Sequence, residues 1–412
     1  MKKLLQINVV INSGSTGKIA EDIGKLAIKN DWDSYIAYGR NDRPSASNKI
    51  RIGNNWDMRR HGIMTRLFDR HGLSSTRATK IFIAEIDKIK PDIIHLHNIH
   101  GYYLNYRVLF EYLETIDTPI VWTLHDCWTL TGHCAYFTYI KCNKWRDATG
   151  CFNCPQKRSY PASLFIERSK KNFEDKKKEF LSIRDRLTLV PVSNWLLDIC
   201  SQSFFKDVPI KRIHNGVNTN VFKSISQGER DCVFKKYNIN TPFLIVGVAN
   251  IWDKRKGLDD FIKLKTLLPK EYSILLVGLS QKQISSLPQG IIGLTRTENI
   301  SELSNIYASA NVFFNPSMEE TFGLTTIEAL ATGTPAIAYN SSASSEPVDL
   351  GTGFVVEPQD FSAILTHLKE IKKNGKQFYS ATCRGYVMKC FEKEDRYNEY
   401  LQLYTEIIKK KQ

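Results

Sequence analysis

The chain has 412 residues, 42% of them hydrophobic, and a formal net charge of +14 at pH 7. Its length exceeds what one hydrophobic core usually supports, so two domains are expected, and its apolar content is sufficient to fill both cores. No apolar run approaches the roughly 18 residues of a membrane-spanning helix. The positive charge favours an anionic partner but does not choose among nucleic acid, lipid headgroups and phosphorylated small molecules.

The opening residues MKKLLQINVVINSG are predicted to form the first β-strand. They imitate a signal peptide, but Gln6 and Asn8 interrupt the apolar part and no small-residue cleavage site follows. The chain is therefore predicted to be cytoplasmic. Its nine cysteines are an odd number, which argues against a full disulfide framework.

Short apolar runs alternate with helix-like stretches along the chain. Most of the runs are continuously apolar, as in parallel strands that are covered on both faces, which predicts an α/β protein with doubly wound sheets. Strands are predicted at Leu4–Ile11, Ser34–Tyr38, Ile93–His97, Ile120–Leu124, Leu187–Val192, Phe243–Ala249, Ser273–Val277, Val312–Asn315 and Pro335–Tyr339. Helices are predicted at Ile19–Lys29, Arg77–Lys88, Leu258–Leu268, Ile300–Ala308 and Thr325–Ala331.

This alternation breaks once, across about 206–240, where polar and turn residues precede a fresh strand. The predicted organisation is a first domain over 1–205 with a cysteine-rich insertion at about 127–160, a linker over 206–240, a second domain over 241–380 and C-terminal helices over 381–412. The stretch Lys376–Lys411 carries so many apolar residues that a partner domain is expected to cover it.

Basic residues cluster at 59–72 and 167–180 and at the C-terminus. The second cluster contains interspersed acids, which predicts a solvated helix face. The first cluster mixes four arginines, Arg59, Arg60, Arg66 and Arg70, with apolar residues. That mixture fits an element resting on an anionic membrane surface and fits an ordinary amphipathic helix about as well.

The most informative segment is NPSMEETFGLTTIEALATG, which begins at Asn315. It predicts a strand that ends in a proline turn, followed by a short helix. In open α/β sheets, ligands bind beyond the carboxyl ends of strands, where helix N-termini offer free N–H groups to phosphate. Glu320 precedes this helix and Glu328 lies about one turn inside it. Because carboxylates repel phosphate and accept hydrogen bonds from hydroxyls, the pair fits a nucleotide sugar, whose diphosphate lies between a sugar and a ribose.

The same segment resembles the E-x7-E signature of the retaining nucleotide-sugar glycosyltransferases of family 4. The resemblance implies the GT-B fold, in which two Rossmann-like domains face a central cleft and the C-terminal helices cross back to the first domain. It further implies that Glu320 contacts the donor sugar and that Glu328 binds the ribose. The helix start would hold the diphosphate, through Thr321, Phe322, Gly323 and Leu324.

A second matching segment, GVANIWDKRKGLDDF, places Arg255 and Lys256 between a buried strand and a helix. In the family, a lysine at the Lys256 position and an arginine a few residues earlier hold the leaving phosphates. The earlier position lies near Asn250, so this sequence departs from the pattern, and Arg255 is predicted to substitute. The helix dipole slightly opposes cations at this place, which favours a functional reason for them over mere solvation.

Two further segments match the family on the first domain. In TLHDCW, the strand-terminal His125 is predicted to contact the donor sugar, with Asp126 orienting it. In NSGSTGKIAEDIG, the glycine loop lacks the spacing of a phosphate-binding P-loop, since Asn12 stands where a glycine is required. The resemblance implies that this loop brings the backbone close to the donor, and Gly17 is the predicted contact.

Weaker matches surround these segments. IIHLHNIHGYY contains His97 and Asn98, which are predicted on the acceptor side. IHNGVNTNVF precedes the donor domain, and its Asn215 is predicted to bind the donor.

Four cysteines, Cys134, Cys142, Cys151 and Cys154, follow the spacing C-x7-C-x8-C-x2-C. Four thiolates can hold a tetrahedral zinc ion and so brace a long insertion. The spacing is not a standard one, and reduced or partly buried thiols are the alternative. A catalytic zinc ion is not expected, because four thiolates would close the site.

Together these matches predict a retaining hexosyltransferase that uses a UDP- or GDP-sugar and needs no catalytic metal. Its predicted acceptor is a saccharide, carried on a polyprenyl lipid, in bacterial surface polysaccharide synthesis, with the enzyme peripheral to the inner face of the membrane and binding no nucleic acid. One alternative is a basic, zinc-stapled nucleic-acid-binding protein, which would place aromatics among the basic residues, but these are sparse in 167–180. Another is a sugar-nucleotide epimerase on the same fold, although such enzymes lack this E-x7-E context.

Overall fold

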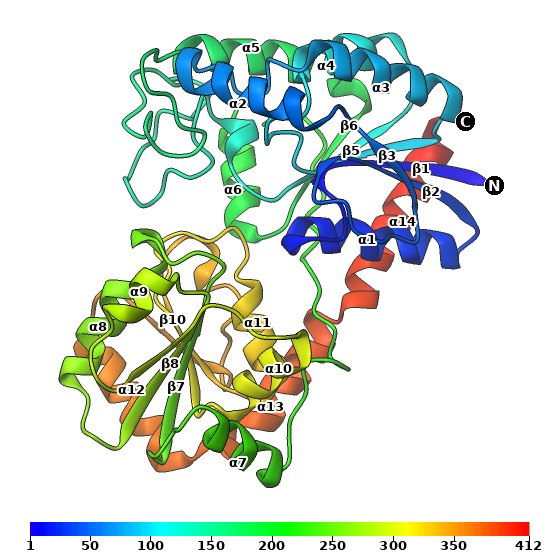
Figure 1. The fold of residues 1–412 in the computed structure, drawn as a ribbon. Helices are drawn as coiled ribbons and strands as arrows, with labels where there is room; N and C mark the ends of the chain where they lie inside the picture. Colours follow the sequence, from blue (N-terminus) through cyan, green and yellow to red (C-terminus); the bar gives the residue numbers. More distant parts are fainter. Residues whose placement is uncertain (412) are drawn as a thin grey trace. The chain divides into compact units, whose positions relative to one another are not determined.

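The computed structural model describes residues 1–411 and divides into two compact units. Unit 1 comprises residues 1–213 and the end of the chain from Tyr397, and unit 2 comprises residues 214–396. Each unit contains one six-stranded parallel sheet with helices on both faces (Figure 1). The prediction of two doubly wound α/β units is confirmed.

The sheet of unit 1 has the strand order β3-β2-β1-β4-β5-β6. In Figure 1, α3, α4 and α5 cover one face, and α1 and α14 cover the other. The strands are β1 (Lys2–Val10), β2 (Trp32–Arg40), β3 (Asn48–Arg51), β4 (Ile93–Leu96), β5 (Ile120–Leu124) and β6 (Leu187–Pro191). The helices are α1 (Gly14–Lys29), α2 (Asn55–Phe68), α3 (Thr76–Ile89), α4 (Tyr106–Thr115), α5 (Ser169–Leu181) and α6 (Asn194–Gln202).

The sheet of unit 2 has the order β12-β11-β10-β7-β8-β9. Its strands are β7 (Phe243–Val248), β8 (Tyr272–Val277), β9 (Ile291–Leu294), β10 (Val312–Asn315), β11 (Ala336–Tyr339) and β12 (Gly353–Val356). Its helices are α7 (Gln227–Lys236), α8 (Leu258–Leu267), α9 (Gln281–Ser285), α10 (Ile300–Ser309), α11 (Leu324–Ala331), α12 (Phe361–Asn374) and α13 (Lys376–Cys390), and α14 (Lys393–Lys411) begins here.

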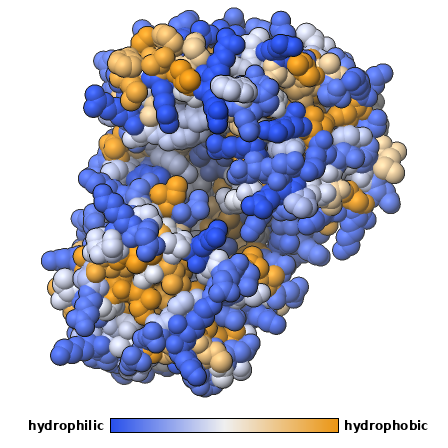
Figure 2. Space-filling view, viewed as in Figure 1, coloured by the Kyte–Doolittle hydropathy of each residue, from blue (hydrophilic) through white to orange (hydrophobic). Residues whose placement is uncertain are grey.

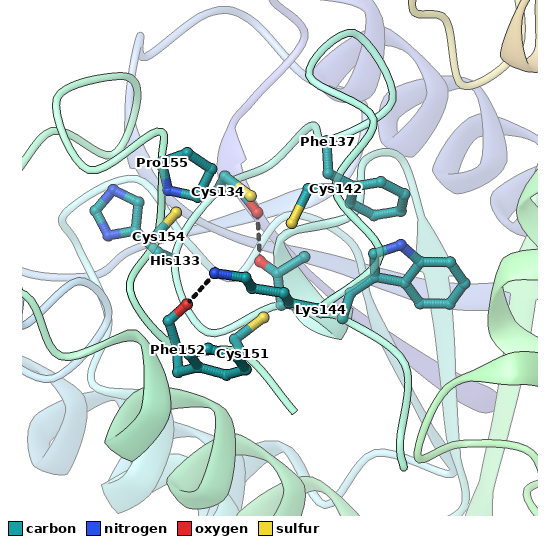
Figure 3. A pocket seen from close by; sticks show the side chains of 11 residues that line it. His133, Cys134, Phe137, Cys142, Lys144, Cys151, Phe152, Cys154 and Pro155 are labelled. Atoms are coloured by element: carbon teal, nitrogen blue, oxygen red, sulfur yellow. Dashed lines mark hydrogen bonds between the residues drawn. The ribbon is translucent and has the colours of Figure 1, made fainter. Parts of the chain in front are cut away.

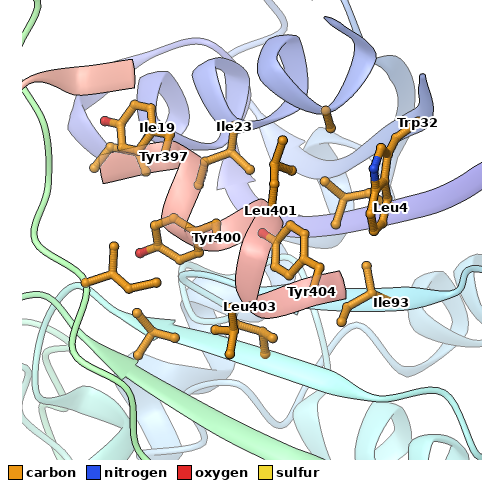
Figure 4. Packing of buried hydrophobic residues seen from close by; sticks show 14 residues of the cluster. Leu4, Ile19, Ile23, Trp32, Ile93, Tyr397, Tyr400, Leu401, Leu403 and Tyr404 are labelled. Carbon is orange, nitrogen blue, oxygen red and sulfur yellow. The ribbon is translucent and has the colours of Figure 1, made fainter. Parts of the chain in front are cut away.

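The last helix, α14, completes the core of unit 1. Its apolar side chains pack with residues of β1, α1 and β4 in one buried cluster, where Tyr404 is fully buried (Figure 4). The Tyr404 hydroxyl lies 2.6 Å from Nδ1 of His95, and the Thr123 hydroxyl donates to the Tyr400 hydroxyl at 3.1 Å. The apolar residues expected in this stretch are therefore covered by the first sheet.

Three features differ from the sequence predictions. The range 206–240 is not a plain linker, because it contains α7, and its first residues stay with unit 1, where the Lys211 amide bonds to the Leu189 carbonyl. The helices predicted over Lys376–Lys411 are present as α13 and α14, but the predicted start of the crossover at 381 falls inside α13, and the chain rejoins unit 1 only at Tyr397. Gln412 lies outside the described residues. The 167–180 segment is not uniformly solvated, since α5 buries Lys176 with 2% of it exposed.

Lys176 shows why the predicted solvated face at 167–180 is only partly correct. Its ammonium donates to the backbone oxygens of Trp128 and Thr131 at 2.6 and 2.9 Å and lies 3.4 Å from the centre of a Trp128 ring. Burial lowers its pKa to about 7. A helix face that carries mostly solvated lysines can therefore still direct one of them inward when carbonyl oxygens and an aromatic ring replace its water.

Candidate active site

Both sheets have a point at which the strand order reverses. In unit 2 the chain builds β8 and β9 on one side of β7 and then places β10 on the other side. In unit 1 the same reversal separates β1 from β4. Ligands of open parallel sheets bind beyond the carboxyl ends of the strands at such switch points. The residues predicted at 255–256 and 320 follow β7 and β10, and those at 17 and 97–98 follow β1 and β4.

At the unit 2 switch point, the structure brings Lys256 and Glu320 together. Lys256 ends a short 3-10 helix (Lys254–Lys256), and its Nζ lies 2.5 Å from Oε1 of Glu320. Both side chains are about one-fifth exposed, at 20% and 18%. The ammonium and the carboxylate are therefore paired with each other while still being reachable from solvent.

Arg255 lies beside this pair and is held by acids of its own. Its guanidinium donates to Asp253 Oδ2 at 2.7 Å, and its Nη1 lies 3.9 Å from Oε2 of Glu319. Glu319 is buried, with 1% exposed. The sequence motifs did not point to Asp253 or Glu319, although two adjacent glutamates shortly after a buried strand were a signal that more than one carboxylate has a structural role here.

Gly257 allows the loops after β7 and β10 to pack closely together. Gly257 has a φ of 74°, which favours glycine, and a Cβ at this position would lie 2.6 Å from the Pro316 carbonyl oxygen. Next to it, the amide of Met318 donates to the Arg255 carbonyl at 2.7 Å. The close approach of these two loops sets the position of the Lys256–Glu320 pair.

The helix α11 begins just after this pair. The Glu320 amide donates to Oγ of Ser342 at 2.8 Å, and Gly323, with a φ of 84°, provides the turn into the helix. No side chain caps the helix start, Phe322 and Gly323 are buried, and Thr321 and Leu324 are half-buried. Amides at an uncapped helix start are available to an anion.

Glu328 lies within α11 and is partly exposed. Its Oε2 accepts a hydrogen bond from the hydroxyl of Tyr307 at 3.0 Å, and burial raises the pKa of that phenol well above its usual range. The hydrogen bond fixes the direction of the carboxylate. Glu328 is thus an oriented acceptor on the same helix whose start follows Glu320.

Asn215 also belongs to unit 2, and its neighbour His214 packs on Phe322 with ring centres 5.4 Å apart. The Asn215 side chain is 4% exposed, and its Oδ1 has no hydrogen-bond partner among the described residues. A buried amide oxygen without a partner is costly, so a ligand or water donor is expected beside it.

At the unit 1 switch point, polar side chains inside the sheet organise the predicted histidines. Nε2 of His97 lies 3.1 Å from Oε1 of Gln6, and its Nδ1 lies 3.1 Å from Nε2 of His125. The two imidazole rings stack at an interplanar angle of 13°. The backbone amide of Asn98 donates to the Asn8 side chain at 3.3 Å. The polar residues that interrupt the first strand therefore hold the loop after β4.

These histidines are neutral at pH 7. Burial lowers the pKa of His125 to about 4, against a smaller opposing effect of Asp126, and lowers the pKa of His97 well below its ordinary 6.5. His97 is only 1% exposed, whereas His125 is half-buried. The arrangement can therefore orient a neutral imidazole at position 125 and does not supply a positive charge.

One expectation for unit 1 needs correction. Asp126 orients His100: its carboxylate lies 2.8 Å from His100 Nε2 and accepts the Trp128 amide at 2.9 Å. His100 in turn bonds to the hydroxyl of Tyr160 at 3.0 Å, across 60 residues of sequence that gave no signal of the contact. Gly17 is buried, and a Cβ there would lie 3.0 Å from Val10 Cγ2, so tight packing against β1 is a second reason for a small residue here, and its contact with the donor stays a prediction.

The four cysteines do not form the predicted zinc centre. Across residues 1–411, no group of three or more His, Cys, Asp or Glu side chains is placed to hold a metal ion. Cys134, Cys142, Cys151 and Cys154 all line one small pocket of about 10 Å³, but Lys144 lines it too (Figure 3). The Lys144 ammonium donates to backbone oxygens at the pocket, and a resident cation opposes a second one.

The thiols instead interact with one another. A hydrogen bond from the Cys134 thiol lowers the pKa of Cys154 to about 7, and the same contact together with burial raises the pKa of Cys134. Burial raises the pKa of Cys151 to about 12. The cysteine-rich insertion is thus held by packing and hydrogen bonds between reduced thiols.

Comparison with known proteins matches most of the chain to two glycosyltransferase family models. The family described as "Glycosyltransferase Family 4" matches residues 20–221, and "Glycosyl transferases group 1" matches residues 242–374. The chain is 28% identical to the putative colanic acid biosynthesis glycosyl transferase WcaC of Escherichia coli K12 over 170 residues, which span 38% of this chain and only 40% of WcaC. It is 23% identical to a 41.2 kDa protein in the cps region of Klebsiella pneumoniae, over 94% of this chain and 96% of that one.

The fold has solved counterparts. One is HepE of Anabaena, whose structure in complex with UDP-glucose superposes with a TM-score of 0.68 at 13% identity, over 98% of this chain and 100% of that one. None of the helices in the described part of the chain has the length and apolar composition needed to cross a membrane.

Proposed function

The chain belongs to the group 1, family 4 glycosyltransferases, and from this premise we propose that it transfers a sugar from a nucleotide-sugar donor to a saccharide acceptor, with retention of anomeric configuration. The names of its relatives support a role in bacterial surface polysaccharide synthesis, since WcaC is assigned to colanic acid and the Klebsiella protein to the cps region. The observation that carries the proposal is the Lys256–Glu320 pair at the unit 2 switch point.

The donor diphosphate binds at the start of α11, with Lys256 and Arg255 beside it. The uncapped amides of this helix start and two adjacent cations together offer what a diphosphate requires. A UDP-sugar is the first donor to test because HepE binds UDP-glucose in its solved complex. A GDP-sugar would make the same phosphate contacts, so residues other than these must determine which nucleotide base the enzyme accepts.

When the donor binds, the Lys256–Glu320 ion pair opens. Lys256 turns to the phosphate, and Glu320 accepts hydrogen bonds from hydroxyls of the donor sugar. Glu328, held by Tyr307, accepts from the ribose, and Asn215 offers its unpartnered Oδ1 to a donor hydroxyl. The ion pair stabilises both side chains in the absence of donor. When it opens, Lys256 becomes available to the phosphate and Glu320 to the sugar at the same time.

Catalysis rests on electrostatic stabilisation of the leaving group. As the bond from the anomeric carbon to the diphosphate breaks, negative charge grows on the phosphate oxygens, and Lys256, Arg255 and the α11 amides stabilise it. The departing phosphate takes the proton of the acceptor hydroxyl, which forms the new bond on the same face of the sugar. In unit 1, His125 contacts the donor sugar as a neutral imidazole, positioned through His97 and Gln6, and the loop with Asn98 receives the acceptor.

The test is a screen of UDP-, GDP- and ADP-sugars for slow donor hydrolysis by the full chain. We expect one donor to be hydrolysed, and we expect Lys256→Ala and Glu320→Ala to reduce that activity sharply while Lys254→Ala, at the exposed neighbouring lysine, retains it. Hydrolysis should survive EDTA. Equal activity in Lys256→Ala and Lys254→Ala would overturn the assignment, and release of an epimerised nucleotide sugar would indicate the epimerase alternative.

A further inference from the structure

An open pocket of about 780 Å³ lies between α2 and α3 in unit 1. Three residues at helical spacing on α2, Asp57, Arg60 and Met64, form one wall. The first half of α3 forms the other, and the connecting loop closes the end. The remaining lining residues are Arg70, Leu73, Ser74, Ser75, Thr76, Arg77, Lys80, Ile81 and Ala84.

The pocket is strongly basic and its cations lack protein partners. Arg60, Arg70, Arg77 and Lys80 line it, and none of them forms an ion pair within residues 1–411. The Nε of Arg70 is buried with no hydrogen-bond partner. The single carboxylate of the lining, Asp57, already accepts the Asn54 amide at 3.0 Å in a capping box. Four uncompensated cations around one cavity predict an anionic ligand.

Hydrogen-bond donors suited to phosphate converge on the same cavity. The helix α3 has 14 residues, no acidic residue in its first turn and no side chain capping its start, and its first residues, Thr76 and Arg77, line the pocket. The pocket is also preformed. His61 of α2 bonds to the Ser75 hydroxyl at 2.9 Å and accepts the Gly72 amide at 3.0 Å, which ties α2 to the start of α3.

The rim of the pocket is apolar and exposed. Ile81, which lines the pocket, is 58% exposed, and Met64, Leu73 and Ala84 line it as well; outside the lining, α2 also exposes Ile63 at 56% and Phe68 at 40%. Apolar patches interrupt the hydrophilic surface at the top of Figure 2, over unit 1. Apolar side chains beside a phosphate-sized basic pocket suit a ligand with a charged head and an apolar tail.

We propose that the pocket between α2 and α3 binds the phosphate or diphosphate headgroup of an anionic lipid. Arg70 and Arg77 bind the phosphate oxygens together with the α3 amides, and Arg60 and Lys80 add charge around them. The apolar rim then contacts the first carbons of the lipid chain. This deepens the proposed function, since it gives a lipid-linked acceptor or its membrane a specific contact on unit 1.

The first experiment titrates the full chain with inorganic diphosphate by calorimetry, in a Lys256→Ala background that removes the cation proposed for donor phosphates. Arg70→Gln with Arg77→Gln should weaken binding about tenfold for each cation removed. The matched control is Arg59→Gln with Lys88→Gln, which removes the same charge from the same region of α2 and α3 but outside the pocket lining. An equal loss in both double variants would overturn the pocket and leave only general charge attraction.

The second experiment identifies the source of the phosphate. The wild-type chain is sedimented with phosphatidylcholine vesicles that contain either phosphatidic acid, which has a terminal phosphate, or phosphatidylserine, at matched surface charge. We expect stronger binding to phosphatidic acid, with the preference lost in the pocket double variant and kept in the control. Diphosphate binding without a phosphatidic acid preference would overturn the lipid assignment in favour of a free anion.

These measurements are independent of sugar transfer. With Lys256 in place, the pocket double variant should keep its donor hydrolysis, because neither arginine belongs to the switch-point residues. If the double variant loses diphosphate binding but keeps hydrolysis, the result supports the pocket independently of sugar transfer. If the wild-type chain binds diphosphate but hydrolyses no donor, the result counts only against the proposed function. Equal melting temperatures of the two double variants check that both are folded.

Discussion

The two switch points share one topology and use opposite chemistry. In unit 2, charged side chains that remain partly exposed gather around Lys256 and Glu320. In unit 1, the corresponding place holds neutral, mostly buried imidazoles of His95, His97 and His125, organised by hydrogen bonds. A charged group attracts a phosphate, whereas a neutral imidazole orients a hydroxyl without competing for the anion. The fold supplies two equivalent positions, and side-chain charge decides what each can bind.

Because the buried imidazoles lie in unit 1, acid should destabilise unit 1 before unit 2. His61, His71, His95 and His97 are each no more than 4% exposed, and burial lowers every one of their pKa values, that of His61 to about 3. Below the ordinary pKa of 6.5, the unfolded chain binds protons that the folded chain cannot, so stability is lost as the pH falls. Each histidine should cost about 2 kcal/mol at about pH 5.

Hydrogen exchange followed by mass spectrometry from about pH 7 to pH 5, corrected for intrinsic rates, separates the units. We expect protection to fall in unit 1 and to persist in unit 2, which has only His214 and His367. His133 works in the other direction, because burial lowers its pKa but the hydrogen bond and ion pair with Asp69 together raise it above its ordinary value. A uniform loss of protection in both units would show that the buried histidines do not set the acid limit.

Unit 2 should instead be sensitive to the loss of one charge. Lys256→Ala removes a cation that stabilises the leaving diphosphate and leaves Glu320 without its partner. We expect donor hydrolysis to fall on the order of 10²–10³-fold, as when a single group that stabilises transition-state charge is deleted. The measurement is the initial rate at saturating donor, compared with Lys254→Ala. A change in KM alone would indicate ground-state binding and not catalysis.

Sequence patterns predicted the strands whose residues are mostly buried, including β6 at an edge of its sheet, and missed three more exposed edge strands. β3, β9 and β12 each lie at an edge of their sheet and are short and partly exposed, so none has the continuous apolar run that identified the others. The Lys256–Glu320 contact follows from topology, because β7 and β10 are neighbours. That these strands are neighbours could be expected once the fold was inferred. The ion pair itself could not be predicted without knowing how the two loops pack at Gly257.

Contacts between distant loops could not be predicted. Nothing in the sequence links His100 to Tyr160, and Asp126 stands next to His125 in the chain while its carboxylate bonds to His100. In contrast, Gln6 and Asn8 did indicate in the sequence that they make polar contacts. Polar residues in an otherwise apolar first strand must find partners when buried, and both lie at the switch point, where the loops after β1 and β4 meet them.

Loop packing in unit 2 can be tested through its glycine. Gly257→Ala forces a Cβ to within 2.6 Å of the Pro316 carbonyl oxygen at a φ of 74°. We expect the free energy of unfolding to fall by roughly 2–3 kcal/mol, and donor hydrolysis to fall with it, because the same contact positions Lys256. Thermal unfolding monitored by circular dichroism measures the first effect.

The matched control for that variant is Gly228→Ala in α7, where a Cβ meets nothing within 4 Å. It should stabilise the helix by about 0.5–1 kcal/mol, since alanine is the better helix former. If Gly257→Ala proved as well tolerated as Gly228→Ala, the loops after β7 and β10 would have to be more adaptable than their contacts indicate.

The smallest expected effect lies in unit 1, at the contact between α14 and the buried histidines. The Thr123 hydroxyl gives its proton to Tyr400, so it can only accept from His95 Nε2, which lies 2.7 Å away. His95 is therefore protonated on Nε2, and its Nδ1 accepts from the Tyr404 hydroxyl. Tyr404→Phe leaves that Nδ1 buried without a partner, which should lower the free energy of unfolding by about 1 kcal/mol.

Tyr139→Phe, at a tyrosine that is 41% exposed, serves as the control and should leave denaturant unfolding unchanged. The Tyr404→Phe variant also tests whether buried neutral histidines make unit 1 sensitive to acid. Removing a hydrogen bond to the neutral form of His95 makes that form less favourable, so the pKa of His95 should rise toward its ordinary value. The acid sensitivity of unit 1 should then decrease slightly even as its stability at neutral pH falls, because the folded chain gains a proton site that the wild type lacks.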